Sequence, residues 1–362
     1  MSSMRHRNPR RRGPARPGKG ENGRRERSNQ APSQSPLAFV FPGQGSQYVG
    51  MGRRLVESFP SAAKIFSQAD ELLGFSLSKL CFEGPEEELR RTANAQPALL
   101  TCSIAILQVL LEKGIRPGFL AGHSLGEFSA WAAAGALSFA DALKLVLRRG
   151  ELMEQTALSR PGGMLAVLGM RPPDLKQLIS RVKAGVLVIA NLNCPGQIVV
   201  SGEESALRKL REVVLQHEGA RAIPLRVSGA FHSPLMEPAA RAFRQEVMKV
   251  RIAPARLPVI CNVSANPLRD PKEIREAIVA QMTSPVLWEG CVEKLARLGA
   301  TAFLEAGPGE VLCGLIKRIL ENAQTFSADE PEKIEQVMNA LQQQRRPEEK
   351  PEQPTAAEAE SN

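Results

Sequence analysis

With 362 residues, the chain is long enough to bury a large hydrophobic core, as one big domain or as two domains of which one is inserted in the other. Its 43% of hydrophobic and 23% of charged residues are ordinary for a soluble globular protein. We find no apolar stretch that approaches the length of a membrane span and no signal peptide, so we expect a cytoplasmic protein without membrane contact.

The net charge of +9 comes almost entirely from the first 30 residues. They hold nine Arg and one Lys against Glu21 and Glu26, a balance of +8, which leaves the rest of the chain close to neutral. Residues 1–35 contain almost no large apolar side chain and residues 344–362 are polar and acidic, so we predict two disordered tails. A basic tail can contact nucleic acid, but a solvated extension needs no such partner, and we expect none.

The six cysteines are scattered and form no close pair with the spacing of metal ligands. Most lie in apolar runs, which predicts reduced thiols in the core of a cytoplasmic protein and no zinc site. They are Cys81, Cys102, Cys194, Cys261, Cys291 and Cys313.

The first predicted strand, 37–41, is continuously apolar and runs into the glycine-rich turn 42–47. Such a turn can bind phosphate, but the P-loop lysine is missing and the glycine spacing is not that of a Rossmann fold. Its backbone N–H groups can instead stabilise an oxyanion, and Gln44, flanked by glycines, is the candidate donor. The following residues, 47–115, predict several helices, the clearest from Gln96 to Lys113.

The pentapeptide Gly-His-Ser-Leu-Gly at 122–126 follows a short apolar run and precedes a helix of small residues. A strand, a sharp Gly-x-Ser-x-Gly turn and a helix are the context of a nucleophile elbow. The glycines let strand and helix approach closely, and the Ser124 hydroxyl stands at a helix N-terminus, where backbone N–H groups favour negative charge. A serine between glycines can also be only a helix cap, so catalysis requires a base elsewhere in the chain.

Residues 140–158 predict a helix that carries Arg149 and Met153. The segment 162–226 then has the order strand, helix, strand, strand, helix, strand, which is typical of a ferredoxin-like small domain inserted in a larger one. Its strands are predicted at 164–168, 186–190, 197–201 and 222–225, and its helices at 173–182 and 203–216.

The larger domain is predicted to comprise residues 36–161 and 227–343. In its second part we predict strands at 259–263 and from 302, and helices at 274–281 and 311–320. This alternation of strands and helices predicts an α/β fold with a mostly parallel sheet covered on both faces.

Histidine is scarce, so few residues can act as the base that Ser124 needs. His6 lies in the tail, His217 ends a predicted surface helix, and His123 is next to the serine and should point its side chain away from it. His232, in a loop after the small domain, is the leading candidate, although a lone histidine in a loop can also be purely structural.

Seven ordered motifs together resemble the malonyl-CoA:acyl carrier protein transacylase family, the discrete relatives of polyketide-synthase acyltransferase domains. The resemblance covers about residues 37 to 320 and implies an α/β-hydrolase-like large domain. The motifs are FPGQGSQYVGMG at 41–52, GHSLGEFSA at 122–130, RRGELM at 148–153, ANLNCPGQIVVSG at 190–202, GAFHSPLM at 229–236, AQMTSPVLW at 280–288 and EAGPGEVL at 305–312.

The resemblance implies a Ser-His dyad without an acidic third member, in which Ser124 is the nucleophile and His232 the general base. It places the N–H donors of the oxyanion hole at Gln44 and Leu125. It also implies that the main-chain carbonyl of Gln281 orients the histidine.

Four further residues are implied to bind the substrate. Arg149 matches the position whose guanidinium pairs with the free carboxylate of a malonyl group, which acetyl-CoA lacks. Met153, Phe231 and His123 lie in the same motifs, and Phe231 with Leu125 matches the pattern associated with malonyl. Without the resemblance, we would interpret Arg149 as a charge on a helix surface.

The implied reaction is a ping-pong transfer. The malonyl group of malonyl-CoA moves first to serine and then to the phosphopantetheine thiol of acyl carrier protein, for fatty-acid or polyketide chain extension. We expect a monomer without metal or bound cofactor. An acidic carrier protein would suit basic residues such as Lys317 and Arg318.

Two other functions are compatible with parts of the pattern. A serine hydrolase or thioesterase of the α/β-hydrolase type would use the elbow, but it would need an acidic third residue and has no use for Arg149. A non-enzymatic scaffold would use the basic tail as a nucleic-acid anchor, and its activity would survive replacement of Ser124.

Overall fold

The computed structural model describes residues 37–345. The predicted basic tail 1–35 lies outside this range. The predicted tail 344–362 also lies outside it, except that residues 344 and 345 still belong to the last helix.

Six strands form the larger sheet, in the order β10-β9-β1-β2-β7-β8. All neighbouring pairs are parallel except β7 and β8. The prediction of a mixed α/β fold with a mostly parallel sheet is therefore confirmed. The strands are β1 (Leu37–Phe41), β2 (Phe119–Gly122), β7 (Val259–Ile260), β8 (Pro267–Leu268), β9 (Ala302–Glu305) and β10 (Gln324–Ser327).

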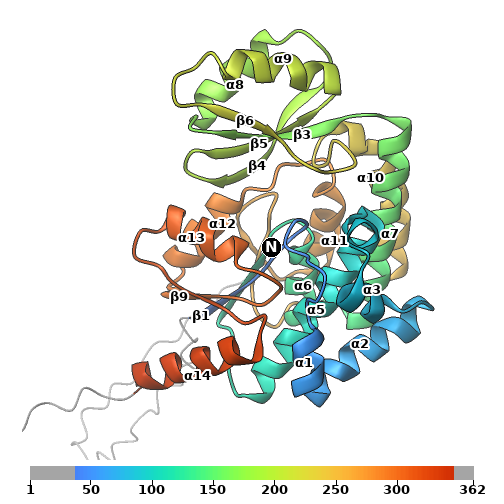
Figure 1. The fold of residues 1–362 in the computed structure, drawn as a ribbon, viewed down its shortest axis with the longest axis vertical. Coiled ribbons are helices and arrows are strands. Elements are labelled where there is room, and N and C mark those ends of the chain that lie inside the picture. The colour runs from blue at the N-terminus through green and yellow to red at the C-terminus, as the bar shows by residue number, and fades with distance from the viewer. Residues whose placement is uncertain (1–36, 346–362) are drawn as a thin grey trace, which may run out of the picture. The chain divides into compact units, whose positions relative to one another are not determined.

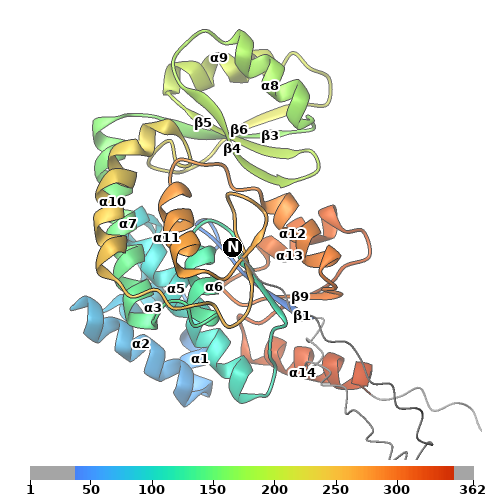
Figure 2. The same cartoon turned by 180° about the vertical axis from the view of Figure 1, so that it is seen from behind.

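Both faces of this sheet are buried, which explains why β1 is apolar at every position. Leu37, Phe39 and Phe41 pack into one hydrophobic cluster, together with residues of α5 and α7. Ala38 and Val40 point the other way, into a second cluster with residues of α12 and α13. Figures 1 and 2 show these helices around the strands. The central sheet is thus held between two helical layers.

Thirteen helical segments accompany the larger sheet within residues 37–345. They are α1 (Arg53–Ser58), α2 (Pro60–Leu73), α3 (Leu77–Glu83), α4 (Glu86–Arg90), α5 (Thr92–Glu112), α6 (Gly126–Ala133), α7 (Phe139–Ser159), the 3-10 helix η1 (Pro234–Met236), α10 (Glu237–Lys249), α11 (Pro271–Ala280), α12 (Trp288–Arg297), α13 (Val311–Ile319) and α14 (Pro331–Arg345).

Helix α5 corrects one expectation from the sequence. It is long and apolar enough to cross a membrane, although we found no such stretch in the sequence. Most of it is buried, in contact with α2 and α7, so its composition is that of a core helix.

The smaller sheet has four antiparallel strands in the order β4-β5-β3-β6. Along the chain its elements are β3 (Gly163–Leu168), α8 (Pro172–Arg181), β4 (Leu187–Cys194), β5 (Gln197–Gly202), α9 (Glu204–Val214) and β6 (Arg221–Pro224).

Side chains alternate across this smaller sheet. Leu165 and Val167 of β3 pack into a cluster of their own with residues of α8 and α9, which cover one face (Figures 1 and 2). Met164 and Ala166 belong instead to the core of the larger part. Val286, which follows α11, bridges to β4 through hydrogen bonds with Ala190 and Leu192. The two sheets are therefore packed together within one compact unit.

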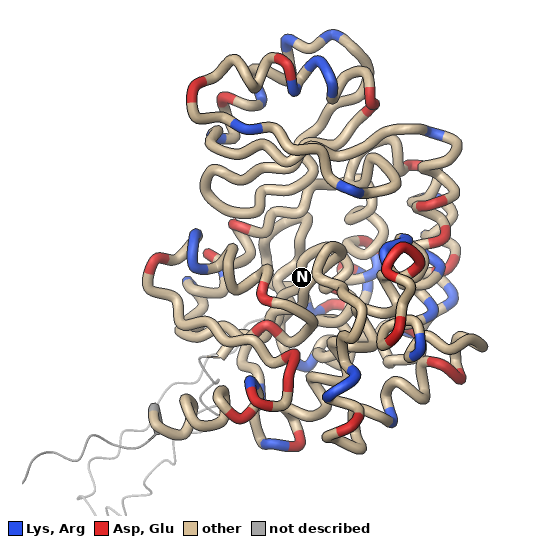
Figure 3. Tube along the Cα trace, viewed as in Figure 1, with Lys and Arg blue, Asp and Glu red and all other residues tan. Residues whose placement is uncertain are grey.

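Lysines and arginines alternate with acidic residues over the outer helices of the described part (Figure 3). All six cysteines are buried and free.

Several predicted elements differ from the structure. The predicted strand 259–263 is only two residues long, because Asn262 leaves the ladder to bond with the loop at Ser124. The helix predicted at 274–281 begins earlier, where the Asp270 side chain accepts the N–H groups of Lys272 and Glu273. Helices α12 and α14 and strand β10 were not predicted.

Candidate active site

Ser124 lies on a tight turn between β2 and α6, as the elbow motif predicts. Its φ is 51°, a left-handed conformation that is rare for a residue with a side chain. A Cβ on Gly122 would lie 2.0 Å from the carbonyl of Gly126, and a Cβ on Gly126 would lie 2.0 Å from the Phe41 oxygen. Only glycine allows these approaches, so both glycines are required to hold Ser124 at the carboxyl ends of β1 and β2.

Asn262, which is fully buried and follows the neighbouring strand β7, forms two hydrogen bonds to this turn. Its Oδ1 accepts the N–H of Ser124 at 2.7 Å, and its Nδ2 donates to the carbonyl of Gly122 at 2.6 Å. One amide therefore satisfies a buried donor and a buried acceptor of the turn and helps to maintain its strained conformation.

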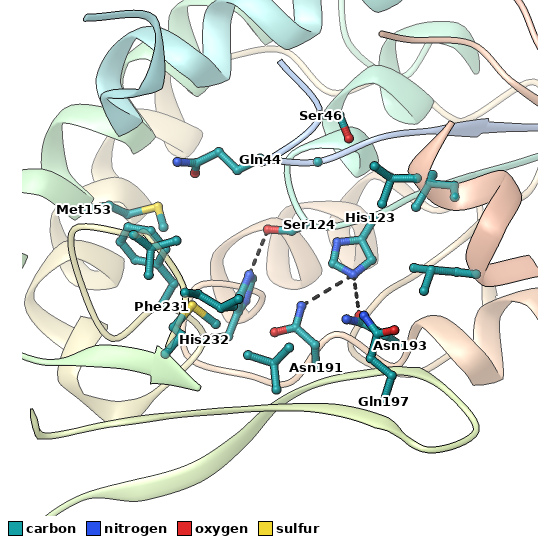
Figure 4. A pocket seen from close by; sticks show the side chains of 18 residues that line it. Gln44, Ser46, His123, Ser124, Met153, Asn191, Asn193, Gln197, Phe231 and His232 are labelled. Atoms are coloured by element: carbon teal, nitrogen blue, oxygen red, sulfur yellow. Dashed lines mark hydrogen bonds between the residues drawn. The ribbon is translucent and has the colours of Figure 1, made fainter. Parts of the chain in front are cut away.

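His232 lies next to Ser124, although the two are far apart in the sequence. The distance from Ser124 Oγ to His232 Nε2 is 2.8 Å (Figure 4). The other ring nitrogen, Nδ1, lies 2.8 Å from the main-chain carbonyl of Gln281, which can only accept. The network thus assigns the proton to Nδ1 and leaves Nε2 as an acceptor for the serine hydroxyl.

The surroundings of His232 keep its ring neutral. It is 4% exposed, and burial, reinforced by the positive charge of Arg149, lowers its pKa to about 3. Its φ of 57° is also left-handed. Strained backbone at both Ser124 and His232 is the pattern found where surrounding structure fixes reacting groups.

The backbone N–H groups of Gln44 and Leu125, both near Ser124, have no acceptor among residues 37–345. Leu125 lies at the N-terminus of α6, and Gln44 lies in the turn after β1. The Gln44 side chain is held by donating to Thr92 Oγ1 at 3.1 Å. Free N–H groups at a helix start and in a glycine-rich turn are suited to an oxyanion.

Arg149 of α7 is buried, not on the surface of its helix. Its guanidinium donates to Gln96 Oε1 at 2.8 Å and to Gln281 Oε1 at 2.9 Å, and its Nη2 lies 3.3 Å from Ser124 Oγ. It forms no ion pair with a carboxylate of the described residues, and its Nε has no partner there. Burial lowers its pKa to about 10, partly offset by the charge of Glu127, so the guanidinium remains a cation at neutral pH.

A cavity of about 180 Å³ opens in front of Ser124 (Figure 4). The predicted residues Gln44, His123, Met153 and Phe231 line it together with the dyad, whereas Leu125, Arg149 and Gln281 are not among its lining residues, although Arg149 reaches Ser124 Oγ. Most of the remaining lining is apolar. Those residues are Gly43, Ser46, Met164, Asn191, Asn193, Gln197, Val199, Leu225, Val227, Val311, Leu312 and Leu315.

His123 faces the smaller sheet and has its hydrogen bonds there. Its Nε2 lies 2.9 Å from Asn193 Oδ1 and 3.5 Å from Asn191 Nδ2, both on β4 (Figure 4). Burial lowers its pKa. Irregular pairing between β4 and β5 occurs at these residues, and such bulges re-aim side chains beside active sites.

Sequence reasoning missed several buried polar residues of this site. Asn262, Glu127, Gln96 and the two asparagines of β4 are all buried and bonded to residues that were predicted. A polar residue inside an apolar run, as in the stretch 259–263, is the signal that could have found Asn262, because a buried polar group needs a partner.

Comparison with known proteins identifies the family of the chain. Residues 38–347 match the family described as acyl transferase domain. The malonyl CoA-acyl carrier protein transacylase of Bacillus subtilis is 47% identical over 312 residues, which cover 86% of this chain and 98% of that protein. The transacylase of the same name from Escherichia coli K12 is 39% identical over 297 residues, 82% of this chain and 96% of that protein.

Solved structures are similar as well. The malonyl CoA-acyl carrier protein transacylase of Clostridium perfringens has a TM-score of 0.82 and 37% identity, covering 85% of this chain and 98% of that one. A malonyl-transacylase in complex with a type II PKS acyl-carrier protein also has a TM-score of 0.82 and 37% identity, covering 84% and 100%. The chain thus belongs to the acyltransferase family of the malonyl CoA-acyl carrier protein transacylases.

Proposed function

We propose that this enzyme transfers the malonyl group of malonyl-CoA to the phosphopantetheine thiol of acyl carrier protein, through a malonyl ester of Ser124. One observation carries the proposal. The Ser124 hydroxyl lies 2.8 Å from an unprotonated imidazole nitrogen and 3.3 Å from a buried guanidinium, so nucleophile, base and carboxylate receptor meet at one oxygen.

In the first half-reaction, Ser124 Oγ attacks the thioester carbonyl carbon while His232 Nε2 takes the hydroxyl proton. The negative charge on the carbonyl oxygen is stabilised by the N–H groups of Gln44 and Leu125, which contribute roughly a hundred- to a thousandfold in rate. The carbon–sulfur bond then breaks, and coenzyme A leaves with the proton from His232.

The second half-reaction runs the same steps in reverse. The carrier thiol gives its proton to His232 and attacks the ester carbon, and Ser124 leaves with that proton. The carbonyl of Gln281 keeps the imidazole in the required tautomer throughout, so a dyad suffices without an acidic third residue.

Arg149 accounts for selectivity. A buried cation whose hydrogen-bond partners are two amide oxygens and a hydroxyl gains strongly from an added carboxylate, and a planar guanidinium can bind one in a bidentate pair. A malonyl group supplies that carboxylate and an acetyl group does not. Met153 and Phe231 supply apolar surface beside it that limits access of water to the ester, which favours transfer over hydrolysis.

The finer assignments of fold and setting are proposals too. Strand order and chain order in the smaller sheet support a ferredoxin-like domain at 162–226, inserted in an α/β-hydrolase-like domain of residues 36–161 and 227–343. We further propose a cytoplasmic monomer. Arg318, which bonds to Gln197 at the cavity, supports carrier docking near Lys317 and Arg318.

A direct assay separates transfer from hydrolysis. Malonyl-CoA consumption is measured with and without acyl carrier protein that bears its phosphopantetheine arm. Transfer predicts consumption that depends on the carrier and yields malonyl-carrier in equal amount. Consumption at the same rate without carrier, with free malonate as product, would instead establish a thioesterase.

A further inference from the structure

The side chain of Gln281 connects most of the site, a role distinct from that of its main-chain carbonyl. Its Oε1 accepts from Arg149 Nη2 at 2.9 Å. Its Nε2 donates to the Ser124 carbonyl at 3.1 Å and to Glu127 Oε2 at 2.7 Å. The orientation of this one amide therefore determines whether Arg149 finds an acceptor or a donor beside it.

Glu127 is a carboxylate buried in the first turn of α6, only 1% exposed. Its Oε2 accepts from Gln281 and also from the N–H of Asn262 at 3.2 Å, while its Oε1 has no partner among the described residues. A buried acid with one free oxygen is costly to maintain, so packing alone does not explain its presence.

A carboxylate at this place imposes one orientation on Gln281. Because its Oε2 already accepts the N–H of Asn262, it faces Gln281 as an acceptor and requires the Nε2 of the amide. The opposite end, Oε1, must then face Arg149. A rotated amide would direct its NH₂ group at the guanidinium, and two donors would face each other in a buried place.

We propose that Glu127 is a positioning residue that determines acyl selectivity by fixing the amide of Gln281, and through it the guanidinium of Arg149. The inference rests on the proposed role of Arg149 in binding the malonyl carboxylate. It assigns Glu127 no contact with substrate. Glu127 Oε2 also accepts the N–H of Asn262, whose side chain holds the turn at Ser124. The same carboxylate therefore helps to position both Arg149 and Ser124.

The test asks whether the length or the negative charge of the side chain at position 127 determines acyl selectivity. Glu127→Gln keeps the length of the side chain and an acceptor oxygen, so Gln281 and Arg149 stay in place and the ratio of malonyl to acetyl transfer stays within about twofold of wild type. Glu127→Asp keeps the charge but is too short to reach Gln281. The same ratio falls about tenfold, the scale of one lost buried hydrogen bond.

Transfer rates of malonyl-CoA and acetyl-CoA to the carrier are measured on one preparation of each variant, so the ratio is independent of the folded fraction. Gln281→Met removes the amide itself and should lower the ratio as Glu127→Asp does, and the double variant no further. Glu335→Asp makes the same change on the exposed side of α14 and serves as matched control.

The inference is overturned if the ratio of malonyl to acetyl transfer in Glu127→Asp equals that of wild type. It is also overturned if this ratio falls in Glu127→Gln but not in Glu127→Asp. A wild-type enzyme that transfers acetyl as fast as malonyl overturns the role of Arg149 and the inference with it. A selective wild type with a selective Glu127→Asp variant overturns the inference only.

Discussion

The larger and the smaller sheet line the same cavity, but they contribute different things to it. The larger part supplies Ser124 from the turn after β2, Arg149 from α7 and His232 from the loop before η1, and the serine hydroxyl contacts both of the other side chains. The smaller sheet supplies a wall, in which Asn191 and Asn193 of β4 contact His123 but not the dyad.

This difference separates two kinds of contribution. We propose that Ser124, His232 and Arg149 act on the reacting atoms, so their removal should lower kcat. Groups on the smaller sheet can only shape the space for the substrate, so their removal should change KM.

The largest effect is expected for His232→Ala. Without the imidazole, no neighbouring group takes the proton of Ser124, and kcat should fall by roughly a hundred- to ten-thousandfold. Steady-state transfer to acyl carrier protein measures it. The conservative control, His217→Ala, changes an exposed histidine and should keep wild-type rates. If His232→Ala kept more than a tenth of wild-type activity, His232 would not be the general base.

Arg149→Ala should lower malonyl transfer by roughly a hundredfold while acetyl transfer is kept or gained, because only malonyl carries the carboxylate. Both rates are measured with the same carrier protein. Arg148→Ala, next to it on α7 but partly exposed and paired with Glu151, is the matched control. Equal loss of both activities in Arg149→Ala would make the arginine structural.

The pH profile tests the neutral state of His232. A free histidine with a pKa near 6.5 would lose about sixteenfold of its basic form between pH 6.5 and 5, but His232 has a pKa of about 3. We expect kcat/KM to change less than about threefold between pH 6.5 and 5 in Glu127→Gln, which removes a carboxyl whose pKa burial raises to about 7. A loss of about sixteenfold in that variant would contradict the lowered pKa.

The same shift affects stability, with a definite sign. The folded pKa of His232 lies below its unfolded value, so the unfolded chain binds more protons between these values. The contribution to stability is complete above pH 6.5 and is lost as the pH falls toward 3. Urea unfolding of wild type and His232→Gln at pH 7 and pH 5 measures it. The variant should lose less stability on acidification.

The smallest effect is expected on the smaller sheet, for Asn193→Ala. It removes the 2.9 Å partner of His123 and a polar part of the wall, so KM for malonyl-CoA should rise roughly three- to tenfold, with kcat within about twofold. Asn339→Ala, an exposed residue of α14, is the control. A hundredfold fall of kcat would show that the smaller sheet takes part in the chemistry.

Elements of the fold could be predicted from the sequence where a short local pattern encodes them, but not where contacts between distant segments determine them. The strand 37–41, the turn at Ser124 and the strand-helix order of 162–226 are encoded in short local patterns, and the structure has all three. The shortened strand at 259–260 was missed, because the bonds that end it come from Asn262 to a distant loop.

The site shows the same limit. Ser124 stands out by its motif and His232 by elimination among four histidines. Arg149 needed the family resemblance, because its position on an amphipathic helix next to Arg148 does not reveal that it is buried. Glu127 and the side chain of Gln281 were invisible, because their role depends only on contacts between segments far apart in the sequence.

The most direct test of the account is the mass of the protein after brief incubation with malonyl-CoA. We expect one malonyl group per chain, located on Ser124 by peptide mapping, absent in Ser124→Ala and discharged when acyl carrier protein is added. No adduct, or an adduct on another residue that the carrier does not remove, would contradict it.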